Sequence, residues 1–240
     1  FCEKPLCLNV AELSQVVAQW RAHEGRWSVL VGFNRRFAPM ARQLRDYLGG
    51  GAGAYSIQYR VNAGALPANH WTRDRAIGGG RLIGEVCHFI DFVSFLTSAE
   101  PKRVWAVHPP TADEDLHLTL EMTDGSVASI AYVAQGGASL PKEWVEVHRS
   151  GRSGVLDNFR ALALHGSSGR PKMRKRGQDK GHRALMAGWV ESLRGGQPLI
   201  SFRSIVATTL ATFAAEESIK SGRVVELDVD HVLDPTHSSA

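Results

Sequence analysis

An alternation of apolar and polar residues in the middle of the chain constrains the fold more than any other feature of the sequence. Leucine or methionine occupies every second position from Leu116 to Met122, and Asp124-Gly125 follows before Val127–Val133. Side chains two apart in a strand lie on one face of a sheet, and Asp-Gly between two such runs favours a tight hairpin. A second hairpin is expected over residues 144–159, with a loop at 150–154. The pattern predicts an antiparallel sheet with one buried face.

The first quarter of the chain has a pattern typical of a parallel sheet. Residues 27–33 (WSVLVGF) form an unbroken apolar run of strand length, as in strands buried on both faces. Helices are expected on either side, over residues 9–23 with Asn9 as N-cap and over residues 38–48 with Pro39 in the first turn. A strand over residues 54–61 follows. Residues 1–36 therefore resemble the end of an α/β domain, and residues 37–230 a helix-plus-sheet domain, with a tail over 231–240.

Composition excludes several classes of protein. The chain has 240 residues, 43% hydrophobic, so it is not disordered throughout. Its 3 cysteines form neither a disulfide framework nor a zinc spacing, which predicts a cytoplasmic location. No run of about 18 apolar residues exists to span a membrane. The net charge of +4 does not by itself predict a nucleic-acid partner. The chain begins at Phe1 inside an apolar stretch, so we expect it to be a fragment.

The helix expected after Gly80 carries the residues best suited to chemistry. Its apolar positions follow a spacing of four and three residues and form one stripe; they are Leu82, Val86, Phe89, Val93 and Leu96. Gly84, Glu85, His88 and Asp91 share the flank away from that stripe. Both carboxylates lie three residues from His88, so we expect them to contact the imidazole, raise its pKa and suit it to proton transfer. The alternative is a structural histidine on a solvated helix face. Gly84 leaves room beside His88 for a ligand or another backbone segment.

Lys4 is the second candidate for chemistry. It follows an apolar strand end in Glu3-Lys4-Pro5, where open α/β sheets bind ligands. A surface lysine is the alternative. Two glycine clusters have the wrong context for a dinucleotide loop, which must follow a strand and open a helix. Residues 49–54 follow a helix and precede a strand, and Gly78-Gly79-Gly80 opens a helix without a preceding strand.

Together these segments resemble the Gfo/Idh/MocA family of oxidoreductases, related to glucose–fructose oxidoreductase and inositol dehydrogenase. The matching segments are Glu3-Lys4-Pro5-Leu6, Gly32-Phe33-Asn34-Arg35-Arg36-Phe37, Gly78-Gly79-Gly80 followed by His88 and Asp91, Gln178-Asp179-Lys180-Gly181-His182, and Ser218-Ile219-Lys220-Ser221-Gly222. The resemblance covers nearly the whole chain in the correct order. It is closest to a branch often fused to an upstream alcohol-dehydrogenase module.

The resemblance implies a fold and a set of site residues. It implies an α/β (α+β) chain in which residues 1–36 are the C-terminal remnant of a Rossmann dinucleotide-binding domain. Residues 37–230 would be the substrate-binding and oligomerisation domain, an open, mainly antiparallel sheet covered by helices. The front half of the Rossmann domain would be absent. The implied catalytic residues are Lys4 and His88, with Glu85 in place of the acid that many members carry at the position of Gly84.

The implied binding residues divide between cofactor and substrate. NAD or NADP would contact Glu3, Pro5 and Asn34, whereas the substrate would contact Arg36, His70, Trp71, Asp91 and Lys180. His70-Trp71 could stack on a sugar ring, or Trp71 could instead pack on the core. The basic run over residues 170–176 is expected to be a solvated loop, either simply mobile or near an acidic sugar. Glu85, Cys87 and His88 do not share one helix face, so we expect no metal.

The leading hypothesis is an NAD(P)-dependent dehydrogenase acting on a hydroxyl of a sugar, nucleotide sugar or cyclitol. The same fold would allow an NAD-assisted glycosidase. A hypothesis of another class is a non-catalytic oligomerisation module that uses an exposed sheet face. These are distinguished by whether Leu116, Leu118 and Leu120 face helices or another subunit. We expect a homo-oligomer, a sugar-like substrate, and neither nucleic acid nor membrane as partner.

Overall fold

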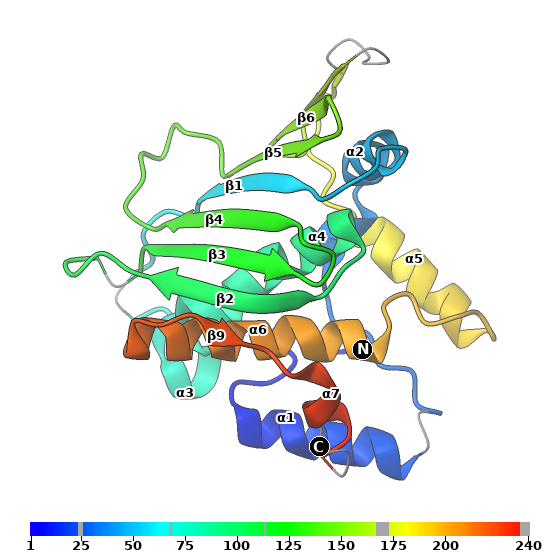
Figure 1. Cartoon of the computed structure of the whole chain (residues 1–240), viewed down its shortest axis with the longest axis vertical. Helices are drawn as coiled ribbons and strands as arrows, with labels where there is room; N and C mark the ends of the chain where they lie inside the picture. Colours follow the sequence, from blue (N-terminus) through cyan, green and yellow to red (C-terminus); the bar gives the residue numbers. More distant parts are fainter. Residues whose placement is uncertain (24–25, 68, 113, 167–172, 236–240) are drawn as a thin grey trace.

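A single nine-stranded sheet organises the molecule (Figure 1). The computed structural model describes residues 1–23, 26–67, 69–112, 114–166 and 173–235. The strands run in the order β8-β7-β6-β5-β1-β4-β3-β2-β9 across the sheet. Their bounds are β1 Ser56–Asn62, β2 Pro101–Val107, β3 Leu116–Met122, β4 Val127–Val133, β5 Glu143–Arg149, β6 Arg152–Asp157, β7 Ala161–His165, β8 Met173–Arg174 and β9 Val225–Glu226. Only β1 and β4 pair in parallel; the other neighbours are antiparallel. The expected open, mainly antiparallel sheet is confirmed.

The hairpin expected from the alternating leucines is present. β3 and β4 pair antiparallel with Leu118 opposite Ile130, and Gly125 in the turn has a φ of 81°. The second hairpin is tighter than expected. β5 and β6 are joined through Ser150 and Gly151, which have φ of 48° and 73°. Two successive residues of positive φ match the right-handed twist of the strands they join, so the expected five-residue loop was wrong.

The described helices are α1 Val10–Ala22, α2 Pro39–Gly49, α3 Arg75–Gly78, α4 Cys87–Thr97, α5 His182–Leu193, α6 Phe202–Ser221 and α7 Val229–Leu233. Helices α2, α4 and α6 cover one face of the sheet, and α1 and α7 pack on α6 instead. Short helical turns lie at η1 (Asn34–Phe37), η2 (Trp71–Arg73) and η3 (Leu82–Val86). The leucines of β3 share one core cluster with Phe89 of α4 and Ala211 of α6. Leu116, Leu118 and Leu120 therefore face a helix layer.

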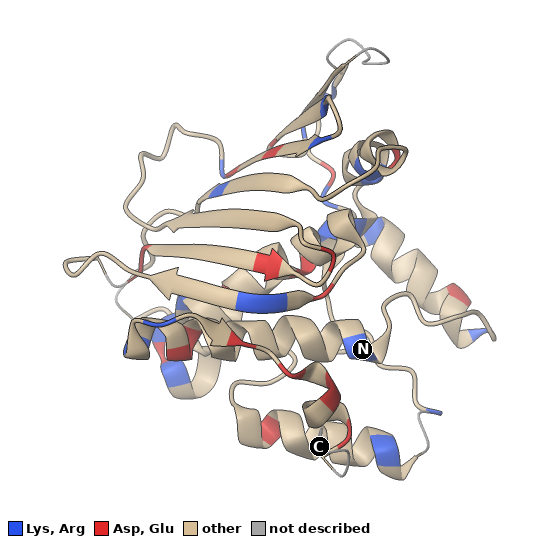
Figure 2. Cartoon of the chain, viewed as in Figure 1, with Lys and Arg blue, Asp and Glu red and all other residues tan. Residues whose placement is uncertain are grey.

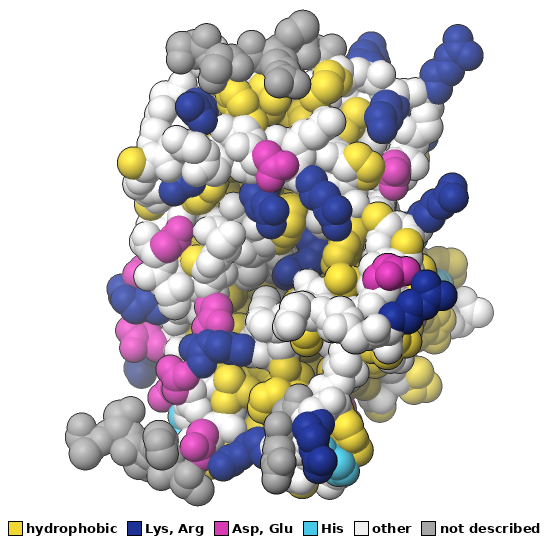
Figure 3. Space-filling model, turned by 90° about the vertical axis from the view of Figure 1, so that its right-hand side faces the viewer, with side chains coloured by type: hydrophobic (Ala, Val, Ile, Leu, Met, Phe, Trp, Pro, Cys, Tyr) yellow, Lys and Arg dark blue, Asp and Glu magenta, His cyan; other side chains and the backbone are white. Residues whose placement is uncertain are grey.

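The opposite face of the sheet carries no helix layer in the described residues (Figure 1). Trp105 on β2 is 43% exposed there, and a shallow hollow beside it is lined by Gln58, His117, Ser129, Trp144 and Glu146, among others. This open face is separate from the buried leucines. On another side of the molecule, Met186, Val190 and Leu193 are exposed on α5 at helical spacing. Figure 3 shows hydrophobic side chains interspersed with basic ones on that side of the molecule.

The N-terminal segment departs from the expected strand. Asn9 caps α1 as predicted, its side chain accepting from the Glu12 N–H at 2.9 Å. Residues 27–33, however, form no strand, and only Val31 makes an isolated parallel bridge with Cys2. Two hydrogen bonds of 2.9 Å carry that bridge, Cys2 N–H to the Leu30 carbonyl and Gly32 N–H to the Cys2 carbonyl. A ladder needs a neighbouring segment along its full length, and within the described residues only Cys2 provides one.

None of the described helices is both long enough and apolar enough to cross a membrane.

Candidate functional site

The helix that carries His88 begins with a widened turn. η3 is one turn of π-helix, and α4 continues from it at Cys87. The predicted apolar stripe is buried in the core as expected; it comprises Leu82, Val86, Phe89, Val93 and Leu96. Such π-turns interrupt regular helices frequently at functional sites. The turn also shifts the register between Glu85 and His88 from that of a regular α-helix.

Position 84 in this turn must be a glycine, because another segment of the backbone approaches it closely. A Cβ atom at Gly84 would lie 2.4 Å from the Gly78 carbonyl oxygen. The sequence left either a ligand or another backbone segment beside Gly84, and the structure places a backbone segment there. An acidic side chain at position 84 has no room in this arrangement.

Lys4 lies at the same turn. Its Nζ donates to the Gly84 carbonyl oxygen at 2.7 Å, and the side chain is half-buried. The bridge between Cys2 and Val31 puts Lys4 just beyond one of two adjacent parallel segments. The structure thus brings Lys4 to the helix of His88, across 84 positions of sequence.

The surroundings of His88 differ from the expected pair of carboxylates. Its ring is half-buried and meets the edge of Phe33 with the ring centroids 6.2 Å apart. Among the described residues, its buried Nδ1 has no hydrogen-bond partner. Burial and the positive charges of Arg35 and Lys4 lower the pKa of His88 well below its ordinary value. The expectations that Glu85 and Asp91 hold the imidazole and raise its pKa were both wrong.

Glu85 belongs to a separate cluster with β4. Its carboxylate accepts from the Tyr132 hydroxyl at 2.8 Å and pairs with Arg81 at 3.4 Å. Burial opposes ionisation of Glu85, but Lys142 and the Tyr132 hydrogen bond keep its pKa below the ordinary value. Glu85 is therefore an anion that accepts hydrogen bonds.

Asp91 and Arg36 are paired with each other. The Arg36 Nε donates to Asp91 Oδ2 at 3.0 Å, with a second bond from its Nη2 to the other carboxylate oxygen. Asp91 is fully buried. Burial raises the pKa of Asp91, although Arg36 opposes this effect. The two side chains expected to contact substrate form a buried ion pair, so neither is presented to a ligand by the described geometry.

A buried anion organises the other charges near His88. Glu143 accepts two hydrogen bonds from Arg35, at 2.8 and 3.0 Å, one from Lys180 at 2.6 Å and one from the Tyr59 hydroxyl. Burial opposes ionisation of Glu143, but Arg35 and Lys180 lower its pKa to about 2. Burial in turn lowers the pKa of Lys180, opposed by Glu143.

Sequence reasoning missed Glu143, Tyr59 and the role of Arg35. One signal was available, because Glu143 occupies an inward-facing position of β5 in register with Val145 and Val147, which are fully buried. A charge at such a position requires partners. Arg35 stands inside one of the family motifs but was not assigned a role.

The residues expected to bind cofactor lie near Lys4. The Asn34 side chain donates to the Lys180 carbonyl oxygen at 2.8 Å. A Cβ at Gly32 would lie 2.8 Å from the Glu3 carboxylate, which places Glu3 against that segment. Pro5 follows Lys4 through a cis peptide bond. These contacts bring the segment Glu3–Leu6 and the segment Gly32–Phe37 together. Cofactor binding by either segment stays a prediction.

His70 and Trp71 lie on a loop packed against the start of the helix. Trp71 is 58% exposed, so the alternative in which it packs on the core was wrong. The His70 ring accepts from the Thr72 N–H at 3.3 Å. A Cβ atom at Gly78, the residue whose carbonyl meets Gly84, would lie 2.6 Å from the Thr72 Cα. The loop is therefore adjacent to the site of Lys4 and Gly84.

Two further expectations concern Cys87 and the basic run. Burial raises the pKa of the Cys87 thiol to about 12, so this cysteine is neutral and hidden in the core. The described residues contain no group of three or more potential metal ligands. Within the basic run, residues 170–172 lie outside the described part of the chain, and Met173–Arg174 forms β8.

Comparison with known proteins identifies the family. The family model of the GFO/IDH/MocA C-terminal domain matches residues 50–170, half of the chain. The chain belongs to the Gfo/Idh/MocA family. The match covers the sheet from β1 to β7 and the helix of His88, and it includes the motif of Gly78–Gly80 with His88 and Asp91.

Curated relatives of this Gfo/Idh/MocA chain are oxidoreductases by name. An uncharacterized oxidoreductase of Bacillus subtilis is 24% identical over 236 residues, covering 93% of this chain and 66% of the relative. Myo-inositol 2-dehydrogenase of Thermotoga maritima is 25% identical over 180 residues, or 71% of this chain and 47% of the relative. Inositol 2-dehydrogenase of Acidothermus cellulolyticus is 33% identical over 122 residues, 49% and 34% of the two chains. The chain spans two thirds or less of the length of each of these relatives.

Solved structures share the fold. An oxidoreductase domain protein from Kribbella flavida superposes with a TM-score of 0.78 at 20% identity, covering 95% of this chain and 73% of that one. An oxidoreductase from Agrobacterium radiobacter in complex with NAD+, L-tartaric acid and magnesium gives a TM-score of 0.74 at 15% identity, covering 94% and 72%.

Proposed function

We propose that this chain is the substrate-binding part of an NAD(P)-dependent oxidoreductase that acts on a hydroxyl of a sugar, nucleotide sugar or cyclitol. The observation that carries the proposal is the meeting of Lys4 with the His88 helix through the Gly84 carbonyl, at 2.7 Å. Family membership and the inositol dehydrogenases among the relatives support the reaction class.

The protonation state of His88 suits removal of a hydroxyl proton. Its lowered pKa keeps the imidazole neutral at neutral pH, so a ring nitrogen is available as acceptor. Nδ1 is buried, while the ring as a whole is half-buried. The other edge of the ring is therefore the one that a substrate hydroxyl would meet.

Lys4 would assist His88 as a hydrogen-bond donor. Its ammonium group already donates to one backbone carbonyl, and an ammonium has three N–H donors. A donor beside the reacting oxygen stabilises the negative charge that develops as the proton leaves. Glu85 is proposed to keep the adjacent turn in place through Tyr132 and Arg81.

The residues near Lys4 fit the nicotinamide end of a dinucleotide. Glu3, Lys4 and Pro5 follow one parallel segment, and Phe33 and Asn34 follow the other; ligands of open α/β sheets bind beyond such carboxyl ends. Bound NAD(P) would supply the hydride acceptor. Lys4, Pro5 and Asn34 would hold its nicotinamide end. The Nδ1 of His88 has no hydrogen-bond partner among the described residues, so this chain leaves one polar atom of the site unsatisfied.

A substrate panel tests the proposal. The complete enzyme would be incubated with NAD+ or NADP+ and a set of sugars, nucleotide sugars and cyclitols deuterated at the carbinol carbons. We expect reduced nicotinamide carrying deuterium at C4 with at least one class of substrate. Release of a glycosidic leaving group without net cofactor reduction would indicate the NAD-assisted glycosidase instead. If no substrate gave either deuterium in the nicotinamide or release of a leaving group, both activities would be contradicted.

Self-association through the open sheet face is a second proposal. Trp105 is 43% exposed beside a hollow whose lining mixes apolar and polar side chains, and protein interfaces combine exposed aromatic residues with polar groups around them. We expect Trp105→Lys to lower the molar mass measured by light scattering. An unchanged molar mass would exclude this face as the interface.

A further inference from the structure

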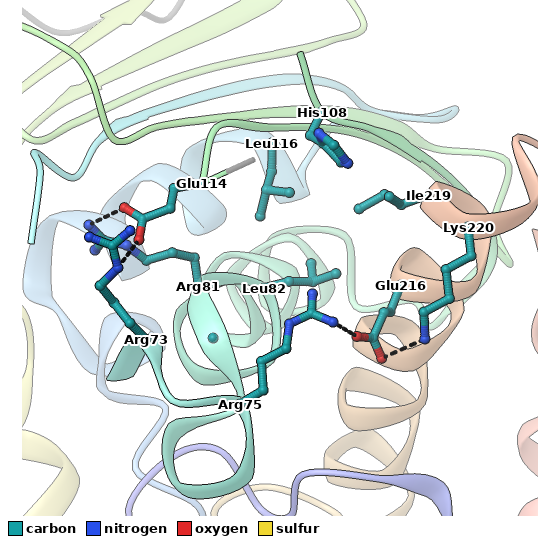
Figure 4. Close-up of a pocket in the computed structure, with 12 residues that line it drawn as sticks. Arg73, Arg75, Arg81, Leu82, His108, Glu114, Leu116, Glu216, Ile219 and Lys220 are labelled. Carbon is teal, nitrogen blue, oxygen red and sulfur yellow. Dashed lines mark hydrogen bonds and ion pairs between the residues drawn. The ribbon is translucent and has the colours of Figure 1, made fainter. Parts of the chain in front are cut away.

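A cavity separate from the Lys4–His88 site lies where three elements meet (Figure 4). The helix start around Gly79 and Arg81 forms one wall, the C-terminal end of α6 another, and the β2–β3 connection the third. Its volume is about 390 Å³, within the range of small-molecule sites. Figure 2 shows basic and acidic residues close together at this end of α6.

Apolar side chains form the interior of the cavity. Leu82, Leu116 and Ile219 point into it between the charged groups (Figure 4). An apolar interior with a few convergent polar groups is typical of sites that hold a small organic molecule. A bare inorganic ion would leave these three side chains without a partner.

The charged groups around this interior are predominantly basic. Glu114 pairs with Arg73 at 2.9 Å and with Arg81 at 3.4 Å. Glu216 pairs with Arg75 at 3.1 Å and with Lys220 at 3.6 Å. Each carboxylate thus faces two cations, so the lining has more positive than negative side chains even without His108. A bound anion would neutralise this excess of positive charge.

Arg81 provides a buried, incompletely satisfied group in the lining. Its side chain is only 5% exposed and also pairs with Glu85, outside the lining, at 3.4 Å. Its Nε has no hydrogen-bond partner among the described residues. The guanidinium donates to the Gly64 carbonyl at 2.8 Å and the Tyr132 hydroxyl at 3.0 Å, which hold it in place. Because its Nε is buried and its other nitrogens have partners, Arg81 supplies a fixed positive charge in the wall of the cavity.

We propose that this cavity binds a small organic phosphomonoester. The phosphate would contact Arg75 and Lys220, which lie together on the Glu216 side of the cavity (Figure 4). The carbon body would lie against Leu82, Leu116 and Ile219, toward Arg81. Arg81 lies between this cavity and the Glu85 cluster. The site is nevertheless tested independently of the proposed reaction at His88, because Arg75 and Lys220 take no part in that reaction.

Calorimetric titration tests the proposal with glycerol 3-phosphate as probe. We expect saturable binding that weakens as NaCl is raised, because added ions screen the attraction. Inorganic phosphate should bind at least tenfold more weakly, because it lacks the carbon body, and uncharged glycerol should give no saturable heat. Equal affinity for inorganic phosphate, or for succinate, would contradict a phosphomonoester site.

The double variant Arg75→Gln/Lys220→Gln removes two exposed cations and leaves the core intact. We expect its Kd for glycerol 3-phosphate to rise at least tenfold. The matched control is Arg194→Gln, which removes an exposed arginine paired with Glu191 on α5. An unchanged Kd in the double variant, an equal loss in the control, or no binding by the unaltered protein would overturn the proposal.

Discussion

Glu143 is the residue on which the buried charges near His88 most depend. Its fully buried carboxylate is the shared acceptor of Arg35, Lys180 and Tyr59. If one partner of a buried charge cluster is removed, the remaining charges stay buried without a counter-ion. The resulting loss of stability is larger than the stability that the complete cluster contributes. The positions of Lys180 and of Asn34, which is bonded to the Lys180 backbone, follow from this single anion.

We expect Glu143→Gln to lower the free energy of unfolding by about 3–5 kcal/mol, because Arg35 would be left buried without its counter-ion. Urea unfolding followed by circular dichroism measures this change. The control is Glu146→Gln on the same strand, whose carboxylate lies on the open face beside Trp144 and should change stability by no more than about 0.5 kcal/mol. Equal effects of the two substitutions would contradict the assigned role of Glu143.

The same carboxylate predicts a dependence of stability on pH. The pKa of Glu143 is about 2 when folded and 4.5 in its ordinary state, so the unfolded chain binds a proton first as pH falls. The contribution of the Glu143 carboxylate to the free energy of unfolding is present above about pH 4.5 and is lost as pH falls toward about 2. Glu143→Gln should show a shallower loss of stability than the unaltered chain across this window. Parallel acid-unfolding curves would contradict the lowered pKa.

At the scale of elements, the π-turn alters the position of Glu85 relative to His88, whereas Asp91 lies with His88 in the regular helix α4 and is held by Arg36. In a regular α-helix Glu85 and Asp91 would both lie one turn from the imidazole. The widened turn of η3 and the pairing of Asp91 with Arg36 give both carboxylates other partners. Gly84 permits this arrangement, because its missing side chain admits the Gly78 carbonyl.

We expect Gly84→Ala to destabilise the fold by about 1–3 kcal/mol, because its Cβ would lie 2.4 Å from a backbone oxygen that cannot move freely. Thermal unfolding measures the change. Gly49→Ala at the end of α2 is the matched control, since a Cβ there meets nothing within 4 Å. If Gly84→Ala were as stable as the control, the close approach of Gly78 would be refuted.

The elements predictable from the sequence are those with local signals. The β3–β4 hairpin, the Asn9 cap and the Pro39 start were correct because alternation, capping and turn chemistry act between near neighbours. Two predictions were wrong, that of a strand over residues 27–33 and that of a contact between Asp91 and His88. Both depend on partners distant in sequence, which are Cys2 for the first and Arg36 for the second. The family motifs singled out Lys4 and His88, and Lys4 contacts the helix of His88 through the Gly84 carbonyl. The motifs did not indicate Glu143.

At the scale of the whole molecule, the proposed function gives this chain the substrate contacts and only the contacts to the nicotinamide end of the cofactor. Cofactor affinity in a Rossmann unit depends on a glycine-rich turn between a strand and a helix. The two glycine clusters of this sequence stand in other contexts, since residues 49–54 lie between α2 and β1, and Gly78–Gly80 lie at the end of α3 and just after it.

We therefore expect calorimetric titration of the 240-residue chain with NAD+ or NADP+ to show no micromolar binding. The contacts to pyrophosphate and ribose would contribute several charge-assisted hydrogen bonds of about 1.5–3 kcal/mol each. Micromolar affinity for either dinucleotide would show that this chain, or a second copy of it, completes the site.

The central claim, that His88 takes the hydroxyl proton in an oxidoreductase, is tested most directly by His88→Asn in the complete enzyme. We expect kcat to fall by about 10²–10⁴ while circular dichroism and the thermal unfolding temperature stay unchanged. His165→Asn, which changes an exposed histidine at the end of β7, is the control and should leave kcat unchanged. A His88→Asn enzyme with unaltered kcat, or one whose activity falls only as far as its stability, would contradict the claim.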